Sequence, residues 1–411
     1  MKILVVSQYF WPEGFRINDI VKSLVERGIE VDVLTGKPNY PEGLIYQGYE
    51  ASGCKVESWC GANVFRVPLY PRGKRNSMKL ALNYLSFIIS GAFFGPWLLR
   101  KQKYDVVFVY GLSPILLAIP AVLIAWLKRK KLIVWVQDLW PQSLAATGYI
   151  KSNFLLRCIE VVVRWIYRHT DLLLVQSRAF EGAVSALAPG KAVVYYPNSV
   201  DSSFASTLDL NHNQPAIDAL ETGFPVVFAG NIGAAQAVEC IVEAASLLQE
   251  VPEIRFVIFG TGSKWDWLNN QITQKGLTNI HLVGRFPIEA MPGYLQKAGA
   301  LLVSLTQEPI FALTVPNKIQ AYMASGRPII ASLNGEGARL VRESGSGLSA
   351  PAQDSVALAK AILTLYRMPE QERRQIGENG RAYYRAHFEH DMLIDELIGH
   401  LEVCATKKGR L

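Results

Sequence analysis

The 411-residue chain has few cysteines and lacks the common signatures of metal and nucleophile sites. Its five cysteines form no C-x-x-C pair, and an odd number in so long a chain argues against a disulfide framework and favours a reducing, cytosolic setting. Without an H-E-x-x-H motif, a P-loop or a pair of histidines at ligand spacing, no metal or other cofactor is expected. The lack of a G-x-S-x-G elbow argues against a serine hydrolase. The N-terminus runs straight into an apolar segment, so no cleavable signal peptide is expected.

Acidic residues are almost absent from positions 64–131, which hold one acid, Asp105, and twelve bases, whereas the whole chain carries a net charge of only +7. The bases are Arg66, Arg72, Lys74, Arg75, Lys79, Arg100, Lys101, Lys103, Lys128, Arg129, Lys130 and Lys131. The same block contains two uncharged apolar runs, Leu80–Leu99 and Gly111–Leu127. Basic flanks around apolar helices predict contact with an anionic membrane surface. Nucleic acid is disfavoured as a partner, because the aromatic residues lie inside the apolar runs rather than between the bases.

The run Leu80–Leu99 is long enough, at twenty uncharged residues, to cross a bilayer. However, Lys79, Asn83, Ser86 and Ser90 recur at helical spacing and form one polar stripe. Both flanks are basic, so the positive-inside rule favours no orientation. We favour interfacial contact over a plain buried helix and over a spanning helix, and all three remain open at this point.

Apolar runs of strand length alternate with helical patterns in both halves, which predicts parallel sheets covered on both faces. In the first half the expected strands are Ile3–Ser7, Val31–Thr35, Val64–Val67, Val106–Tyr110, Leu132–Gln137, Leu172–Gln176 and Val193–Pro197. In the second half they are Val226–Phe228, Arg255–Phe259, Ile280–Val283, Leu301–Ser304 and Ile329–Ser332. A polar, turn-rich stretch at 201–224 with little periodicity is interpreted as the linker and the lead-in to a second domain. We therefore predict two Rossmann-like domains, 1–204 and 205–385, with a C-terminal helix at about 386–411 packing back on the first.

The segment 315–332 contains a cation at an unusual place. Pro316 suits the start of a helix over 316–325, and Gly326 suits its left-handed end. Lys318 then falls in the first turn, where the helix dipole disfavours a positive charge. A diphosphate docked at that N-terminus would explain the lysine. The alternative is an ordinary helix–strand link of an α/β domain.

Glycines and polar residues follow several of the expected strands. Gly260-Thr-Gly262 lacks the third glycine of a dinucleotide fingerprint, because position 265 is Trp, so a nicotinamide enzyme is disfavoured. The loop Phe228–Gly233 and the helix start Gly335–Arg339 have backbone N–H groups suited to phosphate oxygens. Taken singly, each is better explained as an ordinary loop, but several such loops at the strand ends of one domain are stronger evidence than any one. Asp138, at the tip of an expected strand, could orient a sugar hydroxyl, act as a base or cap a helix.

Six motifs together resemble the family 4 retaining glycosyltransferases. They are Val5–Gly14, Leu24–Thr35, Asp138-Leu-Trp-Pro141, Ala229–Gly233, Phe259–Gly262 and Val315–Ile330. The Asp-Leu-Trp-Pro, Gly-Asn-Ile-Gly and Pro-x-Lys motifs are similar to the subgroup that includes L-fucosamine transferases of O-antigen and exopolysaccharide assembly. The resemblance implies the GT-B fold, in which two Rossmann-like doubly wound parallel-sheet domains face a cleft.

The resemblance also implies partners and site residues. It implies a nucleoside-diphosphate sugar, with UDP favoured, held by the C-terminal domain without a metal, and a lipid-linked glycan acceptor on the N-terminal domain at the inner membrane face. Asp138 and Lys318 are the catalytic candidates. The candidates for donor binding are Gly14, Gly230, Asn231, Gly233, Gln236, Gly260, Gly262, Lys264, Arg285, Phe286, Pro316, Asn317, Glu336, Gly337, Ala338 and Arg339.

The chain departs from the family pattern at several functional positions. Two glutamates common in the family are replaced by Leu313 and Ala321, and the arginine and lysine of the first phosphate loop by Asn231 and Gln236. The family usually has a histidine in its N-terminal domain, and the corresponding position in this chain lies near Ser113-Pro114. Lys318 therefore becomes the leading phosphate cation, ahead of Lys264, Arg285 and Arg339. A GT-B sugar-nucleotide 2-epimerase and a non-catalytic nucleotide-sugar-binding protein remain as alternatives.

Overall fold

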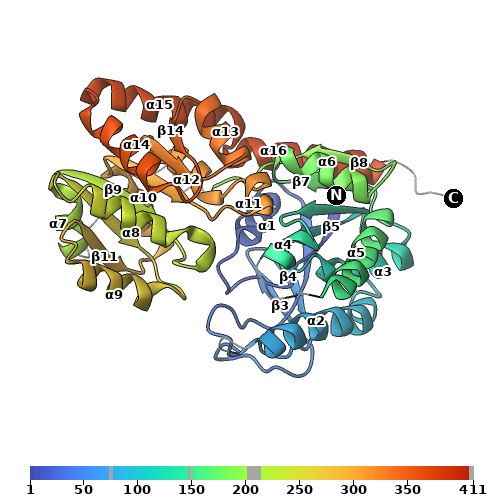
Figure 1. Cartoon of the computed structure of the whole chain (residues 1–411). Helices are drawn as coiled ribbons and strands as arrows, with labels where there is room; N and C mark the ends of the chain where they lie inside the picture. The colour runs from blue at the N-terminus through green and yellow to red at the C-terminus, as the bar shows by residue number, and fades with distance from the viewer. Residues whose placement is uncertain (74–76, 147–149, 151, 201–213, 407–411) are drawn as a thin grey trace. The chain divides into compact units, whose positions relative to one another are not determined.

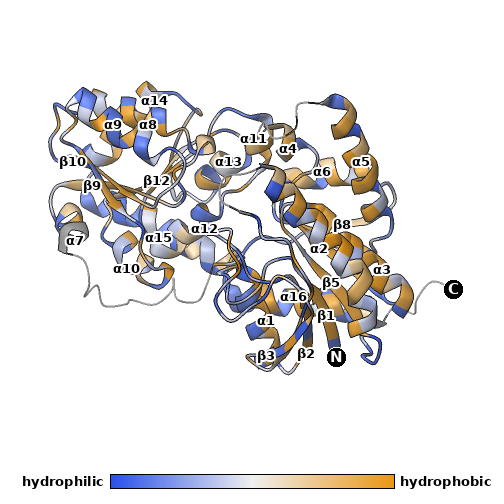
Figure 2. Ribbon diagram, turned by 90° about the horizontal axis from the view of Figure 1, so that it is seen from below, coloured by the Kyte–Doolittle hydropathy of each residue, from blue (hydrophilic) through white to orange (hydrophobic). Residues whose placement is uncertain are grey.

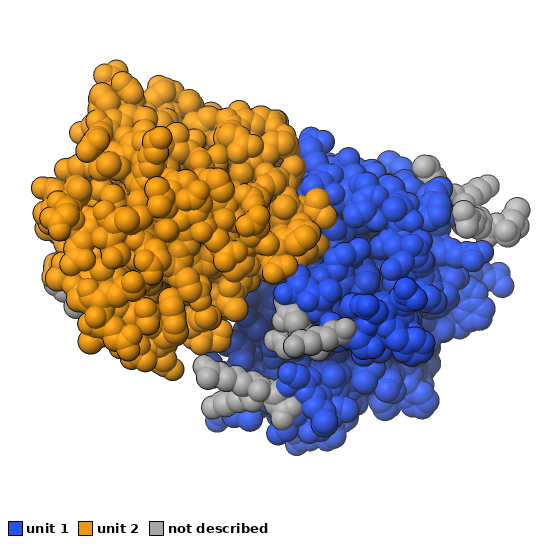
Figure 3. Space-filling model, viewed as in Figure 1, with its two compact units in different colours: residues 1–197, 391–411 blue, residues 198–390 orange. Residues whose placement is uncertain are grey.

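The computed structural model describes residues 1–73, 77–146, 150, 152–200 and 214–406 and divides into two compact α/β units. Unit 1 comprises Met1–Pro197 and Asp391–Leu411, and unit 2 comprises Asn198–His390 (Figures 1 and 3). The two boundaries between the units therefore lie a few residues from those expected at 204/205 and 385/386. Residues 201–213 of the expected linker lie outside the described residues. The rest of it contains a helix, α7 (Gln214–Glu221), so a turn-rich linker reaching to 224 was wrong there.

Unit 1 contains an eight-stranded sheet in the order β3-β4-β2-β1-β5-β6-β7-β8. Its strands are β1 (Lys2–Val6), β2 (Glu30–Thr35), β3 (Lys55–Trp59), β4 (Ala62–Arg66), β5 (Val106–Gly111), β6 (Lys131–Val136), β7 (Leu172–Val175) and β8 (Ala192–Tyr195). All neighbours are parallel except β3 and β4. The central strands are Val/Ile/Leu runs buried along nearly their whole length, as a sheet covered by helices on both faces requires.

Among the described residues, eight helical segments accompany the unit 1 sheet. They are α1 (Arg16–Glu26), α2 (Ser77–Leu98), η1 (Ile115–Ala118), α3 (Ile119–Lys128), α4 (Gln142–Ala146), α5 (Asn153–Arg168), α6 (Arg178–Leu187) and α16 (His390–Thr406). The last of these belongs to unit 1 although it follows all of unit 2 in the chain (Figure 1). Leu393, Leu397 and Leu401 of α16 join the core formed by β1 residues such as Ile3 and Val5, so the C-terminal helix completes the first unit's core.

Unit 2 is built on a six-stranded, wholly parallel sheet in the order β11-β10-β9-β12-β13-β14. Its strands are β9 (Phe224–Ala229), β10 (Ile254–Phe259), β11 (Ile280–Gly284), β12 (Ala300–Ser304), β13 (Ile329–Ser332) and β14 (Gly347–Ala350). Its other helices are η3 (Ala234–Gln236), α8 (Val238–Leu247), α9 (Trp265–Lys275), η4 (Ile288–Ala290), α10 (Met291–Gln296), α11 (Pro309–Leu313), α12 (Asn317–Ser325), α13 (Glu336–Glu343), α14 (Ser355–Arg367) and α15 (Glu370–His387). The strand order reverses between β9 and β12. Open parallel sheets bind ligands beyond the carboxyl ends of the strands at such a switch point.

Candidate functional site

The switch point of unit 2 brings together the loop after β9 and the N-termini of α12 and α13. Gln236, in the turn after β9, accepts a hydrogen bond on its backbone oxygen from Ser304 Oγ at the end of β12, at 2.6 Å. The two helix starts lie side by side, because a Cβ on Gly337 would be 3.3 Å from Cδ of Pro316. Two N-terminal turns and a glycine loop at one edge of a sheet form an arrangement suited to phosphate groups.

Lys318 of α12 reaches from its helix back to the β9 loop. Its Nζ donates to Gln236 Oε1 at 2.6 Å and lies 3.7 Å from the centre of the Phe228 ring. A Cβ on Gly230 would lie 3.1 Å from the same nitrogen, so the lysine occupies the space beside the glycine. Burial lowers the pKa of this amine to about 7. A lysine in the first turn is therefore tolerated partly because the amine can lose its proton at neutral pH.

The helix that carries Lys318 begins one residue later than the sequence suggested. Pro316 is its N-cap residue, with φ −62° and ψ 131°, and the helix itself runs from Asn317. The left-handed end predicted at Gly326 is confirmed, with φ 66°. Asn317 is exposed, and its Oδ1 accepts from Nδ2 of Asn198 at 2.9 Å.

The other three candidate cations differ in their pairing. Lys264 forms an ion pair with Glu239 at 2.7 Å. Arg339 donates to Glu336 at 2.7 Å and also to Glu343, and the hydrogen bond to Glu336 is the largest effect that raises the pKa of its guanidinium. The charges of Lys264 and Arg339 are thus already compensated, which weakens their prediction as phosphate cations. Arg285 is exposed just beyond β11, and within the described chain no hydrogen bond or ion pair is recorded for it.

The glycine loops after β9 and β10 pack against each other. A Cβ on Gly260 would lie 1.8 Å from the carbonyl oxygen of Gly230, and one on Gly262 would lie 2.3 Å from that of Ile232. Ile232 N donates to Thr261 O at 2.9 Å, which joins the loops further. Gly230 and Gly260 also have φ of 139° and 129°, a region that favours glycine. Loop-to-loop packing therefore accounts for these glycines without a ligand, and their role in donor binding stays a prediction.

The remaining predicted donor residues lie at the same edge but differ in exposure. Asn231 is exposed, with its Nδ2 2.6 Å from where a Cβ on Gly233 would be, so its amide folds over that glycine. Phe286 stacks edge-on with Phe259 and Tyr294, at centroid distances of 5.3 and 5.0 Å. Its ring therefore packs against the hydrophobic core of unit 2, next to the carboxyl edge of the sheet.

The N-terminal turn of α13 and the two replaced glutamate positions complete this edge. Ala338 of α13 is buried, and so is Gly337. Ala321 packs against the core of unit 2, and Leu313 ends α11. Neither position offers a carboxylate, as the sequence indicated.

Asp138 lies just beyond β6, at the carboxyl edge of the unit 1 sheet. Its side chain is half-buried, and burial raises the pKa of its carboxyl to about 6. Among the residues that the structure describes, no hydrogen bond or ion pair to it is recorded. Beside it, Trp140 Nε1 donates to Ser113 Oγ at 3.0 Å, so the serine near the usual histidine position supports the Asp138 loop. Gly14, on the loop after β1, is exposed with no atom within 4 Å of where its Cβ would lie.

Glu13 is a buried carboxylate that the sequence analysis did not single out as a site residue. It accepts hydrogen bonds from the backbone N–H groups of Asn39 and Tyr40, both at 2.7 Å, and from that of Phe10 at 3.3 Å. Burial raises its pKa to about 7, although these hydrogen bonds oppose the rise. Glu13 thus ties the loops after β1 and β2 together. No signal along the sequence distinguished this carboxylate from an exposed one, because its two shortest hydrogen bonds come from residues 26 and 27 positions away.

Helix α2 presents its polar stripe inward. Asn83 is buried and donates to the backbone oxygen of Tyr70 at 2.6 Å, while Ser90 Oγ donates to that of Pro68 at 2.7 Å. The apolar residues point outward, and Ile89 and Phe93 are 67% and 73% exposed. The exposed large apolar side chains of α2 are Met78, Leu82, Leu85, Ile89, Phe93 and Trp97. This orientation is the reverse of that expected for a surface helix of a water-soluble protein.

The exposed apolar surface continues beyond α2. Trp126 and Leu127 of α3 and Phe154, Leu155, Val161 and Trp165 of α5 are also exposed. Figure 2 shows α2, α3 and α5 as largely hydrophobic ribbons of unit 1. We call the exposed apolar residues of these three helices the apolar face. By length and composition, α2 is also the one helix in the described chain that could cross a membrane, although 28% of its most apolar window is buried in the protein.

Metal binding was not expected from the sequence. In the described ranges, no group of three or more His, Cys, Asp and Glu side chains could hold a metal ion. Metal independence remains a prediction.

Two family models match consecutive parts of the chain. The "Glycosyl transferase 4-like domain" model covers residues 14–199, and the "Glycosyl transferases group 1" model covers residues 223–368. Together they span most of the chain, one for each unit. The chain belongs to the family 4 glycosyltransferases. The family resemblance found in the sequence motifs is thereby confirmed.

Named relatives of this glycosyltransferase are bacterial. It is 27% identical over 338 residues to WcaI of Escherichia coli K12, named for colanic acid biosynthesis, covering 79% of this chain and 82% of the relative. It is 26% identical over 299 residues to WbjE of Pseudomonas aeruginosa, named as a glycosyltransferase, covering 71% of this chain and 74% of the relative.

Solved structures share the fold of the glycosyltransferase. A sucrose-phosphate synthase from Thermosynechococcus elongatus superposes with a TM-score of 0.74 at 18% identity, covering 98% of both chains. Anabaena HepE, solved in complex with UDP and glucose, superposes with a TM-score of 0.70 at 17% identity, covering 98% of this chain and all of that one. The GT-B fold class expected from the sequence is therefore confirmed.

Proposed function

We propose that this glycosyltransferase moves a sugar, with retention of configuration, from a UDP-sugar to a lipid-linked or growing polysaccharide acceptor. The acceptor would belong to surface polysaccharide synthesis, and the reaction would take place at the cytoplasmic face of the membrane. The observation that carries the donor half of the proposal is Lys318, whose amine lies beside Gly230, donates to the neutral Gln236 and has no recorded ion pair within the described residues. The UDP complex of HepE and the colanic acid name of WcaI support the donor and the product class.

Unit 2 is proposed to hold the nucleotide sugar by its diphosphate. The N–H groups of the first turns of α12 and α13 would bind phosphate oxygens. The leaving diphosphate gains negative charge as the bond to the sugar breaks, and fixed donors near that charge lower the barrier. Lys318 is the cation placed to do this and Arg285 is the second, so the reaction would need no metal. Asp138 of unit 1 would position the acceptor or the reacting sugar.

Release of free UDP on addition of an acceptor tests the proposed reaction. A UDP-sugar incubated with the protein and a lipid-linked acceptor is expected to yield UDP and an extended acceptor, measured by coupled UDP detection and mass spectrometry. UDP release with epimerised sugar in the absence of an acceptor would instead indicate a 2-epimerase. Binding of UDP without turnover over a panel of acceptors and UDP-sugars would indicate a non-catalytic binding protein.

The apolar face is proposed to be the membrane contact. Exposed bases lie where α2 and α3 end, close to the apolar face; they are Arg100, Lys101, Lys103, Arg129 and Lys130. The two helix ends are joined, because Lys128 Nζ donates to the backbone oxygen of Leu99 at 2.7 Å. An apolar surface bordered by bases is suited to an anionic bilayer surface. A lipid-linked acceptor would be met at the same surface.

Reversal of two exposed bases is expected to weaken membrane binding. Each Lys or Arg near an anionic surface contributes about 1 kcal/mol, so Arg129→Glu with Lys130→Glu should weaken binding to phosphatidylglycerol vesicles at least tenfold. Lys128 and Lys131 are left unchanged, because Lys128 bonds to backbone carbonyls and Lys131 pairs with Asp171 at 2.9 Å. Vesicle flotation measures the effect.

A second double variant tests the contribution of apolar contact to membrane binding separately from that of charge. Ile89→Glu with Phe93→Glu should also release the protein from vesicles, since both side chains are largely exposed on α2. Val56→Glu is the matched control, because Val56 is 57% exposed on β3, outside the apolar face. Unchanged flotation of both double variants would refute the membrane contact.

A further inference from the structure

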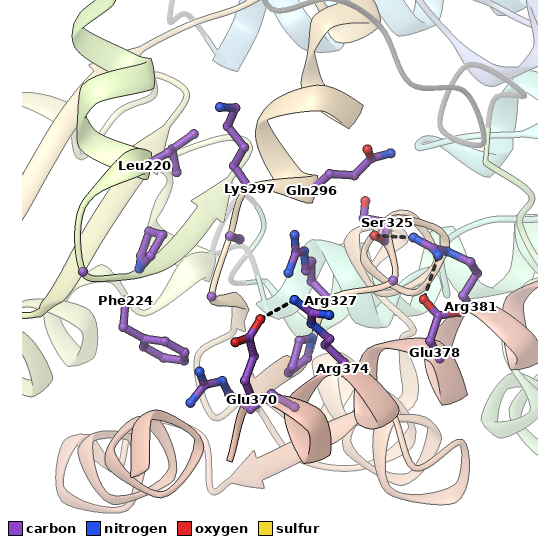
Figure 4. Close-up of a pocket in the computed structure, with 17 residues that line it drawn as sticks. Leu220, Phe224, Gln296, Lys297, Ser325, Arg327, Glu370, Arg374, Glu378 and Arg381 are labelled. Atoms are coloured by element: carbon purple, nitrogen blue, oxygen red, sulfur yellow. Dashed lines mark hydrogen bonds and ion pairs between the residues drawn. The ribbon is translucent and has the colours of Figure 1, made fainter. Parts of the chain in front are cut away.

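A pocket of about 500 Å³ opens at the amino edge of the unit 2 sheet, the edge opposite Lys318 (Figure 4). It lies where β9, β12 and β13 begin, and is lined by Phe224, Gly299 and Pro328 beside those strand starts. Its volume is in the range of small-molecule binding sites. The proposed donor site uses none of its residues, although Ser325–Pro328 of the lining belong to the motif Val315–Ile330.

The lining of this pocket is strongly basic. Five bases and two acids contribute to it: Lys297, Arg327, Arg373, Arg374, Arg381, Glu370 and Glu378. Most of these charged side chains form hydrogen bonds or ion pairs within the protein. Arg373 donates to the backbone oxygen of Met368 at 2.6 Å, and Arg381 bonds to Glu378 at 2.8 Å and to the backbone oxygen of Ser325 at 3.1 Å.

Arg327 differs from its neighbours. Lys297 pairs with Glu221 at 3.0 Å and Arg374 pairs with Glu370. For Arg327 no hydrogen bond or ion pair is recorded anywhere in the described chain, although its side chain is half-buried. Burial and the charges of Arg374 and Arg381 lower the pKa of its guanidinium, and the charge of Glu370 opposes this only in part. Figure 4 shows Arg327 beside Arg374 in the middle of the pocket.

The turn before Arg327 places a second guanidinium at the pocket. Gly326 has φ 66°, and a Cβ there would lie 2.3 Å from Nη2 of Arg381. Only a glycine therefore lets Arg381 lie across the end of α12. Arg327, Arg374 and Arg381, three of the four arginines that line the pocket, therefore surround one recess, and among the described residues Arg327 has no recorded acceptor. Unpaired like charges at close range are destabilising unless an anion joins them.

We propose that this pocket binds the phosphate group of a small soluble metabolite, with Arg327 as the central ligand and Arg374 and Arg381 beside it. Planar guanidinium groups bind phosphate oxygens through paired hydrogen bonds, which suits a cluster of arginines better than lysines. The site is separate from the proposed donor site, because the two lie at opposite ends of α12. The proposal does not depend on the donor or the acceptor of the enzyme.

Thermal unfolding in inorganic phosphate tests the site. At constant ionic strength, wild-type protein is expected to gain about 3 °C in Tm at saturating phosphate relative to chloride, and sn-glycerol 3-phosphate should act alike. Arg327→Gln should abolish the gain. In phosphate-free buffer the same variant should unfold at an equal or higher temperature, because it removes a guanidinium that faces two others. A lower Tm there would show that Arg327 has a structural partner and would overturn the proposal.

Three further comparisons locate the bound phosphate. Arg342→Gln, at an exposed arginine of α13 outside the pocket, should keep the full gain. Lys318→Met should also keep it, whereas a gain lost in Lys318→Met but kept in Arg327→Gln would place the phosphate at the other end of α12 and refute the pocket. Arg327→Gln should leave flotation with phosphatidylglycerol vesicles unchanged. A matching loss of flotation would assign the pocket to a lipid headgroup and overturn the soluble ligand.

Discussion

Replacement of Lys318 by methionine is expected to lower kcat by about two to three orders of magnitude, the loss typical when one donor to a developing negative charge is removed. Methionine keeps the length of the side chain but cannot carry charge or donate to the diphosphate. Steady-state UDP release with saturating donor and acceptor measures the effect. Lys264→Met is the comparator and should cost much less, because Glu239 already neutralises that lysine. Near-normal turnover of Lys318→Met would remove Lys318 from the mechanism.

The same variant should be more stable than the wild type, which separates lost chemistry from lost folding. The pKa of Lys318 falls from 10.5 to about 7 in the folded protein, so the fold disfavours the charged amine. The penalty that Lys318 imposes on folding is therefore absent above pH 10.5 and grows as the pH falls towards 7. At pH 7, Lys318→Met should raise Tm by a few degrees. Because the charged form is needed for the diphosphate, wild-type kcat/KM should fall as the pH rises above about 7.

Replacement of Asp138 by asparagine is expected to lower kcat/KM about 100-fold, the loss typical of a misplaced reacting group. The carboxyl has a pKa raised to about 6 by burial. The charged form is present above that pH, so wild-type kcat/KM should fall tenfold per pH unit below about 6, whereas Asp138→Asn should show no such limb. A pH profile of both proteins between pH 4.5 and 8 measures this. An acidic limb that persists in Asp138→Asn would assign it to another group.

Glu13→Gln is the control for the Asp138 result. Glu13 also has a raised pKa, about 7, but its oxygens are already bonded to backbone N–H groups of the loops after β1 and β2. Its replacement should lower Tm while changing kcat/KM less than Asp138→Asn. A buried carboxylate with bonded oxygens is a structural group, whereas one without recorded partners is available to a substrate.

The alternation of apolar runs and helical patterns was enough to predict most of the fold. Two strands were missed for physical reasons. β3 (Lys55–Trp59) lies at the edge of its sheet, so alternate residues are exposed and no apolar run marks it. β14 (Gly347–Ala350) begins with a glycine, which is rare in strands; here a Cβ on Gly347 would lie 1.8 Å from the backbone oxygen of Ile329.

The sequence predicted where the residues of the candidate site lie, but it did not predict the hydrogen-bond and ion-pair partners of the candidate cations. The partners of Lys318 and Lys264 lie 82 and 25 residues away, so no local pattern identifies them. Arg339 is different, because Glu336 and Glu343 stand three and four residues from it on one helix, a spacing that predicts ion pairs. That signal was present in the sequence and would have removed Arg339 from the leading cations.

The polar stripe of α2 was also visible in the sequence, but the side it faces was not. Its direction depends on acceptors in another segment, the backbone oxygens of Tyr70 and Pro68, which Asn83 and Ser90 reach. Once those hydrogen bonds form, the apolar residues on the opposite side of the helix, such as Ile89 and Phe93, lie at the surface. Hydrogen bonds to a distant segment therefore determine which side of α2 faces the protein, and hydropathy alone does not.

The position of α16 has a consequence for synthesis on the ribosome. The core of unit 1 includes Leu393, Ile394, Leu397, Leu401 and Cys404, which are translated after all of unit 2. The first unit to emerge must therefore keep a patch of its core uncovered until the residues of α16 have been translated. Unit 2, whose residues are continuous in the chain, can complete its core earlier. The nascent chain is then exposed to aggregation and to chaperones through its N-terminal half.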